Sequence, residues 1–166
     1  MNKTMIINID YFNTIGDVLD VTTEKCGVIY SYAKGIEDEI SIDYVDEDNK
    51  AILEKRRYDA CTFFFNINSI GSSRKKEQII REVNTYLKKD GEIYIWDINK
   101  DRGEIIDRKM KILISNNKFK ETTIKNLNFL CECNCEEIEK IVSKYYIIEE
   151  CRVWSDMFYI RAKKKD

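Results

Sequence analysis

The 166-residue chain contains no histidine. Histidine is the side chain most often used as a general base near neutral pH, and it is a common zinc ligand. Its absence excludes every catalytic triad that contains histidine and every histidine-based zinc site. Any chemistry in this protein must therefore proceed without imidazole.

The chain also lacks long apolar runs, a secretory signal and a strong net charge. No apolar run approaches the roughly 20 residues that a membrane-spanning helix needs, and the N-terminal stretch lacks the apolar core of a secretory signal. A net charge of −2 creates no overall field that attracts nucleic acid. The six cysteines fit a reducing compartment better than a disulfide framework, because the chain has enough apolar residues to build a core. We therefore expect a cytoplasmic protein with no membrane or nucleic-acid partner.

Strand-like and helix-like segments alternate along the chain, which predicts one α/β domain spanning residues 1–166 with a mostly parallel sheet. Expected strands are 17–21, 40–44, 59–66, 92–98, 146–154 and 157–163. Expected helices are 27–34, 46–56, 72–89, 103–114 and 134–145, the last opened by Asn134 with Glu137 completing a capping box. The link between the last two strands is too short for a crossover, so they should pair antiparallel. These features predict a three-layer, Rossmann-like fold with Trp96 on an interior strand.

Four places in this order resemble the class I S-adenosylmethionine-dependent methyltransferases. They are the run Val18-Leu19-Asp20-Val21, the acid Asp43, the run from Tyr58 to Asn66, and segment 82–95. The resemblance implies S-adenosylmethionine as cofactor, with Asp43 at the end of its strand binding the ribose hydroxyls. It also implies cofactor contacts from Asp20, the following loop and Asn66.

The chain departs from the family where glycines normally let the backbone approach the cofactor. Thr22 and Glu24 stand at two of those positions, and Cys26 or, with a one-residue shift, Gly27 takes the third. Added Cβ atoms would intrude there, so we expect weak cofactor binding. The short stretch between Asp43 and the next strand also has no room for the family's third strand and the helix after it.

Several residues allow two interpretations. Asp20 could bond the cofactor amine or turn the loop through its side chain. Asn66 and Asn68 could position the methyl acceptor or be loop residues, with the loop role favoured. Asp97, at the end of the fourth expected strand, is the best-placed base if one is needed, whereas the run Phe63 to Phe65 is expected to be core.

The second half of the chain raises two further questions. Cys131, Cys133 and Cys135 alternate, and Cys151 could supply a fourth thiolate, but we favour buried thiols over a metal site. Segment 119–133 has no clear period, which is typical of a lid or a partner-binding surface. The alternative is an extra strand at the sheet edge with the three cysteines facing one way.

Two functions follow from these patterns. The first is a divergent, shortened methyltransferase acting on a small molecule or a partner-held substrate. The second is a catalytically inactive methyltransferase-like binding or scaffold protein with a degenerate cofactor pocket, because fold does not determine function.

Overall fold

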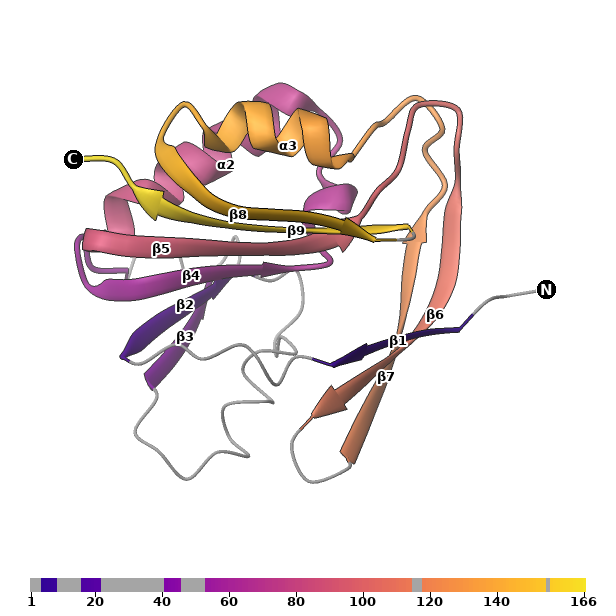
Figure 1. Ribbon diagram of the computed structural model, residues 1–166, viewed down its shortest axis with the longest axis horizontal. Helices are drawn as coiled ribbons and strands as arrows, with labels where there is room; N and C mark the ends of the chain where they lie inside the picture. The colour runs from indigo at the N-terminus through magenta and orange to yellow at the C-terminus, as the bar shows by residue number, and fades with distance from the viewer. Residues whose placement is uncertain (1–3, 9–15, 22–40, 46–52, 115–117, 155) are drawn as a thin grey trace.

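Two β-sheets and two α-helices form the described part of the computed structural model, shown in Figure 1. The structure describes residues 4–8, 16–21, 41–45, 53–114, 118–154 and 156–166. The expected helix at 27–34 and most of the one at 46–56 lie outside these residues. No helix within the described ranges is long and apolar enough to cross a membrane.

The larger sheet has six strands in the order β3-β2-β4-β5-β9-β8. Their bounds are β2 Asp17–Val21, β3 Ser41–Val45, β4 Tyr58–Phe64, β5 Leu87–Ile98, β8 Tyr146–Trp154 and β9 Met157–Lys164. The first four strands in that order run parallel, and β9 is antiparallel to both of its neighbours. Strand β5, which carries Trp96, lies inside the sheet between β4 and β9. The expected strands are therefore present, although β5 begins five residues before position 92 because the preceding helix ends early.

Helices α2 (Ser73–Tyr86) and α3 (Cys135–Val142) lie side by side above one face of this sheet, as Figure 1 shows. Ser72 and Asn134 cap them through side-chain oxygens that accept from backbone N–H groups three residues on. The apolar faces of α2 and α3 pack against alternate residues of the strands, and together they form one hydrophobic core. That core contains Leu19, Phe63 and Ile95 among its fully buried members.

The smaller sheet, in the order β1-β6-β7, corrects two expectations from the sequence. Its strands are β1 Met5–Asn8, β6 Ile106–Ile114 and β7 Lys118–Asn126. The helix expected at 103–114 is wrong, because that stretch contains β6. The less exposed positions 106, 108 and 110 alternate as in a strand, but the middle one is Arg108, which pairs with Asp156. The buried apolar residues Ile106 and Met110 are therefore four apart in the sequence, a spacing that is typical of a helix.

Strand β7 also corrects the idea of an irregular segment over residues 119–133. It pairs with β6 along its whole length rather than with an edge of the larger sheet. Its alternate positions 120, 122, 124 and 126 are the less exposed ones, yet Lys, Thr and Asn occupy three of them. The hydrophobic alternation that identifies a strand is therefore missing from the sequence.

A second apolar cluster joins the two sheets. It combines Val18, Ala60 and Trp96 of the larger sheet with Met110 and Ile124 of the smaller one. Within the described residues, both helices therefore lie on one face of the larger sheet and the smaller sheet packs against residues of the other face. The layers of the described residues therefore follow a helix–sheet–sheet order. The expected three-layer arrangement with further helices stays a prediction, because segment 27–34 and most of 46–56 lie outside these residues.

A buried ion pair joins the N-terminal ends of the two helices. The Nζ atom of Lys76 in α2 lies 2.7 Å from Oε2 of Glu137 in α3, and the Lys76 side chain is 1 % exposed. Ser73 donates a further hydrogen bond to Glu137, and Lys76 also donates to the carbonyl of Glu132. The Glu137 carboxylate therefore bridges helices instead of completing the expected capping box with Asn134.

Breaking this buried pair should destabilise the fold strongly. Lys76→Met leaves the Glu137 carboxylate with little compensation in the interior, which should cost about 3–5 kcal/mol in the free energy of unfolding. Lys144→Met is the matched control, since Lys144 pairs with Glu77 of α2 from a position just beyond α3, but in solvent. Urea unfolding should show almost no change for the control, because exposed pairs are screened by water. Equal losses in both variants would contradict the assignment.

Candidate functional site

The carboxyl ends of the parallel strands β2, β4 and β5 meet at one edge of the larger sheet. These strands end at Val21, Phe64 and Ile98. In open α/β sheets, ligands bind outside the carboxyl ends of the strands. Polar side chains at this edge are therefore candidates for binding a ligand.

Asp20 lies in the penultimate position of β2 and is 1 % exposed. Its Oδ1 accepts a hydrogen bond of 2.7 Å from the hydroxyl of Thr62, its neighbour on β4. This bond fixes one side of the carboxylate between the two strands. Asp20 is therefore oriented by the sheet itself, one residue before the segment that would approach a cofactor.

The backbone turns sharply after β4, at Phe65 and Asn66. Phe65 has a φ of +54°, a left-handed conformation that bulky residues rarely adopt, and its N–H donates to the carbonyl of Trp96 at 2.8 Å. Such conformations persist where the surroundings impose them and often occur at functional sites. The turn directs the Asn66 amide nitrogen to the carbonyl of Val21 at the end of β2.

The amide oxygen of Asn66 is buried and has no hydrogen-bond partner within the described residues. A buried polar atom without a partner costs free energy, so such atoms are uncommon in folded proteins. The Asn66 amide oxygen is therefore a candidate acceptor for a hydrogen bond from a ligand at this edge.

Asp97 lies near the end of β5 and is completely buried. Its carboxylate accepts hydrogen bonds from the backbone N–H (2.9 Å) and the side-chain amide (2.7 Å) of Asn68, and from the N–H of Ile98 (2.7 Å). Burial raises the pKa of Asp97 to about 6, although these hydrogen bonds act in the opposite direction. The carboxylate fixes the short 3-10 helix η2 (Ile67–Ser69) against β5, and its expected role as a base stays a prediction.

An aromatic cluster lies on the side of β5 that faces away from the helices. Trp96 packs against Phe64, Tyr94 and Tyr159 with ring centroids 5.7, 6.0 and 5.1 Å away, and Phe64 contacts Phe65 at 4.8 Å. Phe63 instead belongs to the helix-side core, as expected. The cluster gives the edge an apolar, aromatic border next to the smaller sheet.

The structure corrects the position of Asp43. It is the third of five residues in β3 and pairs in register with Leu19, so it does not end its strand. The expected cofactor contacts Thr22, Glu24 and Gly27 lie outside the described residues. The structure therefore brings Asp20 and Asn66 together at the edge.

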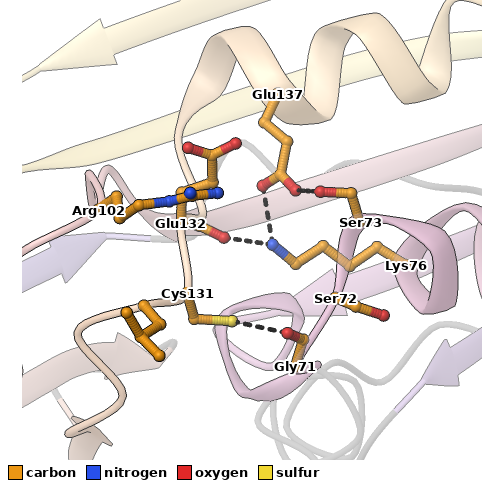
Figure 2. Close-up of a pocket in the computed structure, with 9 residues that line it drawn as sticks. Gly71, Ser72, Ser73, Lys76, Arg102, Cys131, Glu132 and Glu137 are labelled. Carbon is orange, nitrogen blue, oxygen red and sulfur yellow. Dashed lines mark hydrogen bonds and ion pairs between the residues drawn. The ribbon is translucent and has the colours of Figure 1, made fainter.

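A separate cavity of about 270 Å³ lies between the N-terminal ends of α2 and α3, as Figure 2 shows. It is lined by Gly71, Ser72, Ser73, Lys76, Arg102, Leu130, Cys131, Glu132 and Glu137. The lining carries two positive side chains, Lys76 and Arg102, and two negative ones, Glu132 and Glu137. The cavity therefore has no net charge that would favour an anionic or a cationic ligand.

Segment 127–133 is held firmly beside this cavity by the buried side chain of Lys100. Its ammonium donates to the carbonyls of Cys131, Asn128 and Asp101, and its backbone pairs with Cys133. Cys131, Cys133 and Cys135 are all buried, but they do not share a strand face, because Cys135 begins α3. The lid interpretation fits this anchored segment poorly.

Sequence reasoning missed the buried lysines. Lys76 precedes Ile80 and Val83 by four and seven residues, so it occupies the apolar stripe of α2. A lysine at such a position is itself a signal of a buried partner. Lys100 carries no comparable signal, since it follows β5 in a loop and its partners are backbone carbonyls.

The fold is similar to that of known methyltransferases. No protein-family model and no curated protein matches the chain by sequence. Among solved structures, an S-adenosylmethionine-dependent methyltransferase from Methanosarcina mazei is 11 % identical, with a TM-score of 0.57 over 89 % of this chain and 92 % of that chain. One from Mesorhizobium loti is 9 % identical, with a TM-score of 0.55 over 90 % of each chain.

A third similar structure is the N-methyltransferase NodS from Bradyrhizobium japonicum WM9 in complex with S-adenosyl-L-homocysteine. It is 9 % identical, with a TM-score of 0.54 over 91 % of this chain and 79 % of that chain. At such identities, the similarity concerns the fold. The chain therefore has a methyltransferase-like α/β fold.

The raised pKa of Asp97 predicts a specific dependence of stability on pH. Between about pH 4 and 6 the folded state binds a proton that the unfolded state has already released, so stability should fall as pH rises through this window. The contribution amounts to about 3 kcal/mol at 1.36 kcal/mol per pKa unit. Urea unfolding of the parent and of Asp97→Asn should show the variant's relative stability improving by about this amount from pH 4 to 7. A difference that is independent of pH would refute this account.

Proposed function

We propose that this chain binds S-adenosylmethionine at the carboxyl edge of β2, β3 and β4 and transfers its methyl group to a small molecule or a partner-held substrate. The strand order β3-β2-β4-β5-β9-β8 carries the proposal. It has a parallel half, and β9 pairs antiparallel with both β5 and β8, which includes the antiparallel closing pair expected from the sequence. The family's further strand beyond β3 has no counterpart within the described residues.

The polar atoms at the edge fit the adenosine part of such a cofactor. Adenosine offers hydroxyl and amino donors, and two acceptor side chains lie at this edge: Asp20 near the end of β2, and Asn66 in the turn after the neighbouring strand β4. The partnerless oxygen of Asn66 would gain the hydrogen bond that it lacks within the described residues. Asp43 is proposed as a further contact to the ribose, from within β3 rather than from its end.

The chemistry is compatible with the absence of histidine. A bound sulfonium supplies an activated methyl group, so the protein needs mainly to align the acceptor with it. Asp97 contributes by holding η2 and the turn at Phe65 and Asn66 in place. The aromatic border formed by Phe64, Phe65 and Trp96 excludes water from one side of the edge.

The loss of glycines favours the second candidate, an inactive binding or scaffold protein. Thr22 and Glu24 add side chains where the backbone would approach the cofactor, and Glu24 adds a negative charge near the cofactor carboxylate. The shortened sheet also leaves the adenine side more open. Binding, if retained, should therefore be weaker than in a glycine-rich site.

Calorimetry with S-adenosylmethionine and S-adenosylhomocysteine separates the candidates. We expect weak binding, since one lost good contact costs roughly 1–3 kcal/mol, or about ten- to a hundredfold in affinity. Submicromolar binding would contradict the effect assigned to Thr22 and Glu24. No heat at millimolar ligand would exclude the methyltransferase proposal and support the scaffold.

Removing the Asn66 amide should weaken cofactor binding selectively. Asn66→Ala loses both the acceptor and the bond to Val21, so we expect about tenfold lower affinity for S-adenosylhomocysteine. Asn84→Ala is the matched control, because Asn84 also donates to a backbone carbonyl but lies on α2. The control should bind like the parent in calorimetry. Unchanged binding by Asn66→Ala would remove this residue from the site.

A further inference from the structure

Three metal-ligating side chains converge where α3 faces strand β8. The Sγ atoms of Cys135 and Cys151 and the carboxylate of Glu139 all lie within 4.8 Å of one another. The two sulfur atoms are 2.9 Å apart, closer than two thiols in ordinary contact. Neither cysteine is in a disulfide.

The helix contributes two of the three groups through its own period. Cys135 is the first residue of α3, and Glu139 follows four residues later. Residues at this spacing lie on the same side of a helix, one turn apart. The backbone N–H of Cys135 also donates to Asn99 at 2.9 Å, which ties the start of the helix to the end of β5.

A β-bulge in β8 directs Cys151 toward the helix. Ile148 pairs with Ala162 and Cys151 pairs with Ile160, so three residues of β8 span two residues of β9. Ala162 and Ile160 both belong to the helix-side core. In a regular strand, Glu150 would stand opposite Ile160 instead. Bulges commonly re-aim a side chain in this way.

We propose that Cys135, Glu139 and Cys151 form a site for a zinc ion. Thiolates are soft ligands that select zinc, and a carboxylate oxygen is an accepted third ligand. A water molecule would complete the tetrahedron. Glu139 and Cys151 are exposed, which gives an ion access to the site.

This site differs from the cysteine cluster apparent in the sequence. Cys131 and Cys133 are not ligands in it. Their place is taken by Glu139, which the spacing of the cysteines does not indicate. The bound ion would link α3 to the outermost strand of the larger sheet.

Binding must release the protons of the two thiols to water, since thiolates are the ligands. Zinc affinity should therefore increase with pH.

Cobalt(II) titration of the full chain, reduced with a phosphine and handled without oxygen, tests the proposal. We expect one equivalent to produce the visible bands of tetrahedral cobalt together with thiolate charge-transfer absorption, and zinc to displace it. Cys151→Ser should lose the charge-transfer intensity of one thiolate and weaken binding by more than about 100-fold, because even residues behind the ligands commonly contribute 10- to 100-fold.

Two further variants make the test specific. Glu139→Gln should keep the charge-transfer absorption but bind cobalt at least about tenfold more weakly. Cys131→Ala is the control, since Cys131 is a nearby buried thiol that contacts the Gly71 carbonyl instead, and it should bind cobalt like the parent. Circular dichroism verifies that each variant is folded. The proposal would be overturned if the parent gave no cobalt spectrum, or if Cys151→Ser gave the same spectrum as the parent. It would also be overturned if Cys135 and Cys151 formed a disulfide in air and the chain bound no cobalt.

Discussion

The buried carboxylate of Asp97 connects three parts of the molecule that are far apart in the sequence. It accepts two hydrogen bonds from Asn68. Asn68 lies in η2, the short helix that follows the turn after β4. The Asn68 carbonyl in turn accepts from the side chain of Asn126, at the end of β7. The larger sheet, the turn after β4 and the smaller sheet therefore meet in one buried polar network.

The geometry of the candidate site depends on this network. Because η2 is fixed, the preceding turn holds Phe65 in its left-handed conformation and directs Asn66 at the end of β2. The same network keeps the smaller sheet next to the aromatic cluster around Trp96. A charged group in the interior is costly, and the hydrogen bonds that define the edge of the sheet offset only part of this cost, since the pKa of Asp97 stays raised.

The sequence predicts the central strands of the larger sheet well because β2, β4 and the second half of β5 are largely buried. The continuous apolar runs around Phe63 and around Ile95 are recognisable without knowledge of the partners. The smaller sheet is not predicted because Arg108, Thr122 and Asn126 occupy less exposed positions where apolar residues would be expected. Arg108 and Asn126 find their partners, Asp156 and Asn68, on other parts of the chain. Its first strand, β1, pairs with β6 across about a hundred residues of chain, and no local pattern encodes that pairing.

The site is predicted in part for the same reason. Asp20 and Asn66 follow apolar runs, and parallel strands bring such positions to one edge. The register that places Asp43 inside β3 and the bulge that brings Cys151 to α3 are properties of strand pairing, which single-sequence patterns do not contain. Buried partners such as Lys76 and Glu137 belong to the same class, because they are 61 positions apart.

Chemical-shift mapping of the labelled chain with S-adenosylhomocysteine decides whether the carboxyl edge of the larger sheet binds the cofactor, because it locates the ligand as well as detecting it. We expect backbone amides at the ends of β2 and β4, around Asp20 and Asn66, to shift progressively and saturate together. Amides of β8 and those lining the cavity at Lys76 should remain unchanged. Shifts centred on that cavity, or none at millimolar ligand, would contradict the claim that the carboxyl edge of the larger sheet is a cofactor site.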